Sequence, residues 1–326
     1  MNQAAPMFVL NVLGRTITAI LSPDNRLFEL ARRGGRPPSA LTAIAVVLGT
    51  LVLVLIPGQM AARSVVRSFP ADGSQSTAAL IIGNVTMLLS ICLALWIWLR
   101  LSSRRPFSTL GFERNHALPR LLRGAMIGGL MMMATAAVSS ARGVSLGPGR
   151  LQEMGPAAIA AAFLSLLSYF AQGPAEEVLF RGWLLGAIGA RYRPWIGVLV
   201  SSLVFSLAHG LSPGITALGF LNLFLFGVLA AVYALAEGGI WGIGAWHAVW
   251  NWTMGEFLGF ASDGTPHVGF IRSIRADGPA ILTGGAFGPE GGLACTAVFL
   301  LAISFIAARP QVLAHSASGS PGSARC

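Results

Sequence analysis

Two adjacent carboxylates stand at the end of a long apolar stretch, in the segment PAEEVLFRG at residues 174–182. Glu177 and Arg181 are four residues apart, so on a helix they share a face in the order that favours an ion pair. Glu176 points about 100° away on the same helix and has no such partner. A carboxylate without an ion partner in an apolar environment is a competent general base toward water. The segment therefore predicts one supporting acid and one reactive acid.

Histidines and an asparagine follow at four-residue spacing on later apolar segments. The segment FSLAH ends at His209, and the segment HAVWN begins at His247 and ends at Asn251. Residues four apart share one face of a helix, so His247 and Asn251 line one stripe. Two imidazoles and an amide can polarise a reacting carbonyl or, with Glu176, ligate a metal ion whose bound water is the nucleophile. Both alternatives are water-activated hydrolysis, and the sequence leaves them open.

These side chains can meet only if their helices bring them to one depth. If the helix that carries Glu176 continues to a turn at 191–193, Glu176 lies about 22 Å from that turn, at about 1.5 Å per residue. His209 lies about 22 Å beyond the same turn on the returning helix. His247 lies about 12 Å along a later helix, within a turn or two of that level. We therefore expect one acid, two histidines and an amide to converge on a common point.

The composition indicates a membrane protein. Hydrophobic residues make up 54% of the 326 residues and charged residues only 10%, which is outside the range of soluble globular chains. The 22 basic residues are all arginine and exceed the 12 acids, but they flank apolar segments rather than form one basic face. We therefore expect membrane lipid as a partner and no nucleic acid. The three cysteines have no metal-ligand spacing.

Apolar segments long enough to cross a bilayer recur along the chain. The sequence predicts an all-α fold, a polytopic membrane helix bundle of about eight transmembrane helices. If the segments alternate, most arginines fall on one side, and the positive-inside rule places both termini in the cytoplasm. The predicted segments are 40–56, 78–99, 124–141, 155–175 with a continuation, 194–210, 215–236, 239–258 and 291–308.

The remaining segments divide the chain into three parts. The first part is a cytoplasmic or interfacial arm, in which Met7 to Leu21 form either an in-plane helix or a frayed segment. Glu256, near the end of the seventh apolar segment, is expected at the membrane interface, and 259–290 are expected to form a Gly-rich external loop. The predicted parts are an N-terminal arm at 1–38, a membrane domain at 39–310 and a disordered tail at 311–326.

Three motifs in order, EEVLFR (176–181), FSLAH (205–209) and HAVWN (247–251), resemble those of the CPBP family of intramembrane proteases. This family is the CaaX prenyl protease and bacteriocin-processing group, and the resemblance covers about 155–260. It implies an intramembrane endopeptidase that cuts a membrane-associated peptide or protein. The residues to which it assigns the catalytic site are Glu176, His209, His247 and Asn251, supported by Glu177 and Arg181.

The resemblance leaves the mechanism and the substrate open. Its members are described both as metalloproteases and as glutamate-type proteases. Glu176, His209 and His247 are ligand types that suit Zn²⁺, but they lack the compact HExxH spacing on one helix. The arginine-rich, lysine-free composition suggests a bacterial cytoplasmic membrane. Two alternatives are a proton-coupled transporter, since buried acids also mark proton pathways, and a catalytically inactive immunity or binding protein on the same scaffold.

Overall fold

The structure, a computed structural model, describes residues 18–68, 73–112, 115–141 and 143–308. Within these ranges the chain is mostly helical and has one two-stranded sheet. The α-helices are α2 (Arg26–Arg32), α3 (Ala40–Ser68), α4 (Gly73–Trp98), α5 (Ala117–Ser139), α6 (Arg150–Met154), α7 (Ala157–Glu177), α8 (Gly186–Arg191), α9 (Pro194–Ala208), α10 (Ala217–Glu237), α11 (Trp241–Trp252), α12 (Ala280–Thr283) and α13 (Leu293–Ala308). The π-helical segments are η1 (Leu99–Ser103), η3 (Val178–Leu185) and η4 (Thr253–Phe257), and the 3₁₀ turns are η2 (Phe107–Leu110), η5 (Gly285–Phe287) and η6 (Pro289–Gly291).

The described helices confirm an integral membrane protein with several apolar helices. Each predicted apolar segment falls on a helix. The helices long and apolar enough to cross a membrane are the 4 runs Thr77–Ser103, Ala117–Ser139, Ala157–Arg191 and Ala217–Glu237. Shorter apolar helices are Ala40–Val54, Pro194–Ala208 and Leu293–Ala308. The polytopic helical fold is therefore established, whereas the number of about eight transmembrane helices stays a prediction.

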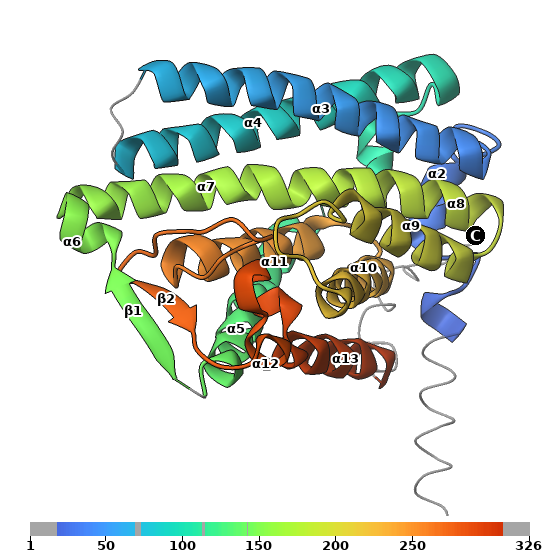
Figure 1. The fold of residues 1–326 in the computed structure, drawn as a ribbon. Helices are drawn as coiled ribbons and strands as arrows, with labels where there is room; N and C mark the ends of the chain where they lie inside the picture. The colour runs from blue at the N-terminus through green and yellow to red at the C-terminus, as the bar shows by residue number, and fades with distance from the viewer. Residues whose placement is uncertain (1–17, 69–72, 113–114, 142, 309–326) are drawn as a thin grey trace, which may run out of the picture.

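The helix that carries the two glutamates lies between two groups of helices. Figure 1 shows α3 and α4 on one side of α7, with α5, α10, α11 and α13 on the other. The helices α3 and α4 pack together, and α4 packs on α7. On the other side α11 contacts both α5 and α7, while α10 contacts α9 and α13. Glu176 and Glu177 at the end of α7 are accordingly 8% and 0% exposed, so both are enclosed by protein.

Glycines allow α11 to approach both of its neighbours closely. A methyl group on Gly124 would lie 1.9 Å from the backbone oxygen of Gly242, and one on Gly128 would also meet the α11 backbone. These two glycines form a GxxxG pattern on α5, which lets helix backbones pack tightly in a membrane. On the other neighbour, a methyl group on Gly173 would lie 2.6 Å from a backbone nitrogen of α11. The helix with the HAVWN motif is thus held between α5 and α7.

The helix with the two acids continues well beyond them. The helical run Ala157–Arg191 has 35 residues and passes through Pro174. Directly after Glu177 the helix changes to the π-helical segment η3. Proline removes one helical hydrogen bond, and π-helical turns are frequent at functional sites. The helix that carries Glu176 therefore continues to Arg191, as was assumed when Glu176 and His209 were placed at one depth.

The segment 259–290, expected as a loop, contains a strand. Within it β2 (Arg272–Ala276) pairs antiparallel with β1 (Val144–Pro148), which lies before α6. Figure 1 shows this sheet at the α6 end of α7, away from α2 and α8. No residue of either strand is buried, so burial imposes no alternation of apolar and polar residues from which the sequence could have predicted them.

The predicted terminal parts are described only in part. The arm at 1–38 contains α2, whose Phe28 is fully buried in the core. The alternatives for Met7 to Leu21 concern residues that lie mainly outside the described ranges, and the tail at 311–326 lies outside them entirely. The division of the chain into an arm, a membrane domain and a tail therefore stays a prediction.

Candidate active site

One carboxylate oxygen faces two imidazoles from different helices. Oε2 of Glu176 lies 3.9 Å from Nε2 of His209 and 3.9 Å from Nε2 of His247. Glu176 belongs to α7, His209 caps the end of α9, and His247 lies on α11. The structure therefore brings together the acid and the two histidines that were predicted to converge. The separations are too long for direct hydrogen bonds and suit a bridging water.

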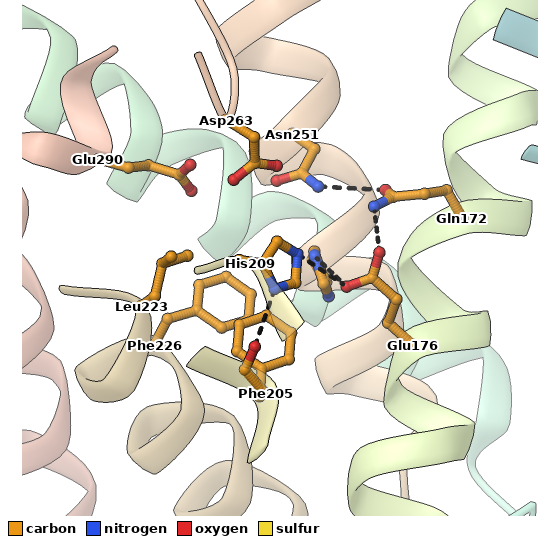
Figure 2. A pocket seen from close by; sticks show the side chains of 10 residues that line it. Gln172, Glu176, Phe205, His209, Leu223, Phe226, Asn251, Asp263 and Glu290 are labelled. Carbon is orange, nitrogen blue, oxygen red and sulfur yellow. Dashed lines mark hydrogen bonds and ion pairs between the residues drawn. The ribbon is translucent and has the colours of Figure 1, made fainter. Parts of the chain in front are cut away.

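The other oxygen of the same carboxylate belongs to a chain of amides. Oε1 of Glu176 accepts a hydrogen bond of 2.7 Å from Nε2 of Gln172. Oε1 of Gln172 in turn accepts one of 3.1 Å from Nδ2 of Asn251. Figure 2 shows this chain from Asn251 through Gln172 to Glu176 along one side of the pocket. Gln172 was not predicted as a site residue, although its position four residues before Glu176 places both side chains on one face of α7.

Backbone and side-chain acceptors orient both imidazole rings. Nδ1 of His209 lies 2.9 Å from the carbonyl oxygen of Phe205. Nδ1 of His247 lies 2.8 Å from Oε1 of Glu177. A carbonyl or carboxylate oxygen only accepts hydrogen bonds, so each Nδ1 donates. In the neutral rings, Nε2 then presents its lone pair toward Glu176.

Glu177 and Arg181 form a fully enclosed ion pair. The distance from NH1 of Arg181 to Oε1 of Glu177 is 3.0 Å, and both side chains are 0% exposed. The guanidinium carbon of Arg181 also lies 4.6 Å from the centre of the Phe205 ring, in cation–π geometry. The ion pair predicted from the four-residue spacing is present in the structure. Because Glu177 also holds His247, it connects the ion pair to the site.

Two further acids border the pocket and come from the segment 259–290. Figure 2 shows Asp263 and Glu290 across the pocket from Glu176. Oε1 of Glu290 accepts a hydrogen bond of 2.7 Å from Nε1 of Trp250. Burial raises the pKa of Glu290, and the nearby Asp263 carboxylate raises it further. Both acids were missed, because a loop has no periodicity from which the direction of a side chain can be read.

The pocket is small and mostly polar on one side. About 10 Å³ of it can hold the centre of a water molecule, which is close to the room that one water needs. Its side chains come from α7, α9, α10, α11 and the segment before α13. The lining residues are Gln172, Glu176, Phe205, His209, Leu223, Phe226, His247, Asn251, Asp263 and Glu290.

The fit of a metal ion can be tested on the donor set. Glu176, His209 and His247 are ligand types that zinc accepts. Among the described residues, however, no three His, Cys, Asp or Glu side chains form a group that could hold a metal ion. The distances of 3.9 Å between carboxylate oxygen and ring nitrogens agree with that. The donor types suit zinc, but their arrangement in this structure does not, and we derive no step through a metal.

Comparisons with known proteins agree with the motifs. Residues 158–253 match the family described as Type II CAAX prenyl endopeptidase Rce1-like. A protein of Escherichia coli described as an uncharacterized 24.3 kDa protein is 30% identical over 138 residues. That region covers 41% of this chain and 61% of the relative, which is less than two thirds of its length. No solved structure matches. The family match confirms the resemblance, and the matched range contains every residue to which the motifs assign the site.

Proposed function

We propose that this chain, whose residues 158–253 match the family described as Type II CAAX prenyl endopeptidase Rce1-like, is an intramembrane endopeptidase. Its substrate is a membrane-associated peptide or protein, and the nucleophile is a water activated by Glu176. The observation that carries the proposal is the position of Oε2 of Glu176, which is buried, has no hydrogen-bond partner among the described residues and lies 3.9 Å from Nε2 of each imidazole. A water there can donate one hydrogen bond to the carboxylate and the other to one of the two ring nitrogens.

In the first step Glu176 acts as a general base. A water between Oε2 and the imidazoles gives a proton to the carboxylate, and its oxygen attacks the carbonyl carbon of the scissile bond. Gln172 holds the other carboxylate oxygen at 2.7 Å, so the basic oxygen keeps its direction toward the pocket. Preorganised groups of this kind need no rearrangement during the reaction.

In the second step the tetrahedral intermediate collapses. Asn251 lies four residues from His247 on the inner face of α11, and its amide has two N–H donors, of which one bonds to Gln172. The second N–H is available to the developing oxyanion. The protonated Glu176 then gives its proton to the leaving amine as the carbon–nitrogen bond breaks. The carboxylate is thereby regenerated for the next water.

The two histidines have different access to a substrate. The side chain of His209 is 20% exposed and that of Glu176 is 11% exposed, whereas that of His247 is 3% exposed. His247 is also fixed by Glu177. We therefore assign His209 to the side from which the peptide enters and His247 to the closed end. The lysine-free composition supports a bacterial cytoplasmic membrane as the location, and the distribution of the arginines supports both termini in the cytoplasm.

The proposal is tested with the full chain in lipid nanodiscs and a library of membrane-associated peptides, analysed by mass spectrometry. We expect Glu176→Gln to keep its thermal stability and to lose cleavage by at least about 10³-fold, because the base is removed. Glu153→Gln is the matched control, since Glu153 is exposed on α6. Cleavage by Glu176→Gln at the wild-type rate would exclude Glu176 as the base.

Two further arms separate the alternatives. Proton flux into liposomes that depends on Glu176 would favour a transporter, and wild-type protein that cleaves no peptide while it binds one would favour an inactive binding protein. Assays with and without a chelator, together with metal analysis of the active protein, test the zinc mechanism. Loss of activity on chelation, with recovery after Zn²⁺ is added, would show that Glu176, His209 and His247 move together to bind a metal ion.

A further inference from the structure

A second pocket lies at the other end of the bundle, between α2, the end of α4 and η3. The volume open to the centre of a water molecule is about 90 Å³ in this pocket and about 10 Å³ in the pocket beside Glu176. It therefore accepts a group of several atoms. Among the described residues, its lining contains two arginines and two tryptophans and no acid. The lining residues are Ala31, Gly34, Gly35, Arg36, Pro37, Pro38, Trp98, Ser102, Ser103, Arg105 and Trp183.

Arg105 is a buried cation in this pocket. The residue is only 4% exposed. Its NH1 donates a hydrogen bond of 3.1 Å to the carbonyl oxygen of Leu30, and its guanidinium carbon lies 5.8 Å from the centre of the Trp183 ring. A guanidinium has five N–H donors. The remaining nitrogens are not among the fully buried, unpaired atoms of the described residues, so they reach accessible space.

The charge of Arg105 is not compensated in the described part of the chain. The other buried arginines each pair with a glutamate, as Arg150 does with Glu256 and Arg181 with Glu177. For Arg105 the structure shows no such partner, and burial lowers its pKa to about 10. Removing a cation from water without a counter-ion costs several kcal/mol. An anion in the pocket would offset this cost.

The position of the pocket identifies the class of anion. Its wall includes Trp98 and Ser103, at the end of the apolar run Thr77–Ser103. Tryptophans concentrate at the boundary between membrane and water, and the two indoles of the pocket contact each other edge to face at 6.0 Å. Basic pockets between helices at this boundary bind anionic lipid head groups. The exposed Arg36 adds a second cation to the same pocket.

We propose that this pocket binds a phosphate group, with Arg105 as its buried donor and Arg36 as a second cation. The phosphate is carried by an anionic phospholipid or is free in water, and both sources use the same donors. Bound there, it connects α2 to the end of α4 and to η3, the segment that also contains Arg181. The inference does not depend on the proposed peptidase activity.

The experiment uses the full chain, purified in detergent and freed of lipid. Three probes are titrated: dihexanoyl phosphatidylglycerol, inorganic phosphate, and dihexanoylglycerol, which has no phosphate. The shift of the thermal unfolding midpoint gives each affinity, and native mass spectrometry counts the bound lipid. We expect wild-type protein to bind a phosphate probe and Arg105→Gln to bind it at least about tenfold more weakly, because charge-assisted hydrogen bonds are lost.

Arg104→Gln is the matched control, because the neighbouring Arg104 is exposed, and we expect it to keep wild-type affinity. Tighter binding of phosphatidylglycerol than of phosphate identifies lipid as the source, and equal binding identifies free phosphate. If Arg105→Gln does not fold, Arg105→Lys is compared with Arg104→Lys and should bind more weakly, since lysine lacks the fork of donors. The proposal is overturned if wild-type protein binds neither phosphate probe, binds dihexanoylglycerol equally well, or loses no affinity when Arg105 is replaced.

Discussion

Two regions of this molecule contain the same three groups, a buried glutamate held by an arginine and by Nδ1 of a histidine. In the inner set, Glu177 bonds to Arg181 at 3.0 Å and to His247 at 2.8 Å. In the outer set, Glu256 bonds to Arg150 and, at 3.0 Å, to His267. The outer set connects the end of η4 to α6 and to the segment before β2. The same hydrogen-bonded set of glutamate, arginine and histidine therefore occurs twice, but only the inner set borders the pocket that contains Glu176.

The difference between the two sets is how completely their acids are satisfied. Glu256 uses Oε1 for the histidine and Oε2 for the arginine. Glu177 uses Oε1 for both partners, and its Oε2, like that of Glu176, is buried without a hydrogen-bond partner among the described residues. A buried carboxylate with hydrogen bonds to both oxygens stabilises the fold. A buried oxygen without a partner destabilises it, and binding of a ligand or a proton relieves that cost. A Glu–Arg–His set alone thus does not indicate a reactive site. The proposed reactive site rests on the additional acid beside it, Glu176, whose Oε2 has no hydrogen-bond partner among the described residues.

The largest effect on stability is expected at the arginine of the inner set. Arg181→Gln leaves Glu177 charged and enclosed with only His247 as its partner, so the free energy of unfolding should fall by about 3–5 kcal/mol. Unfolding in mixed micelles measures it. Arg275→Gln is the control, because Arg275 is exposed on β2. Equal stability of the two variants would show that the inner ion pair contributes nothing to the fold.

The next largest effect is expected on catalysis rather than on stability, at Asn251 in the inner region. Asn251→Ala removes the amide proposed to stabilise the oxyanion, so kcat should fall by about 10²-fold, with little change in the unfolding midpoint. Asn84→Ala is the matched control, since Asn84 also donates to a side chain of α7, that of Ser168, at 3.0 Å. If both variants lose activity equally, the role of Asn251 is packing rather than catalysis.

The sequence was sufficient to predict the inner region because helix geometry is regular. A constant rise per residue placed Glu176 and both histidines at one depth, and four-residue spacing placed Arg181 beside Glu177. The structure brings these groups together at distances of 3.9 Å or less. Catalytic roles do not follow from convergence, so they stay predictions.

The outer region was not predictable in the same way. The expected position of Glu256 at the membrane interface stays a prediction. The sequence did not predict that Glu256 is 2% exposed and paired with Arg150, which is 106 residues away in the sequence. Its other partner, His267, lies in a segment without helix or strand. Contacts of this kind depend on how a long loop folds back, and periodicity carries no information about that path. Asp263 and Glu290 were missed for the same reason.

A smaller effect is expected when the acid of the outer set is neutralised. Glu256→Gln keeps the shape of the side chain and can still accept a hydrogen bond from Arg150, so the unfolding free energy should fall by about 1–3 kcal/mol. Peptide cleavage by the folded fraction should stay at the wild-type level, in contrast to Glu176→Gln. A loss of cleavage as large as that of Glu176→Gln would remove the distinction between a structural set and a reactive one.

The smallest effect is expected at the histidine of the outer set, whose side chain is 15% exposed. His267→Gln should reduce the unfolding free energy by about 0.5–1.5 kcal/mol, because water can replace part of the lost hydrogen bond. In a double-mutant cycle with Glu256→Gln, the coupling between the two residues should be about 1 kcal/mol, since they are in direct contact. Chemical unfolding of the four proteins measures this coupling. A value near zero would mean that His267 only lies beside the acid, and that the outer set is in effect an isolated Arg150–Glu256 pair rather than the counterpart of the inner one.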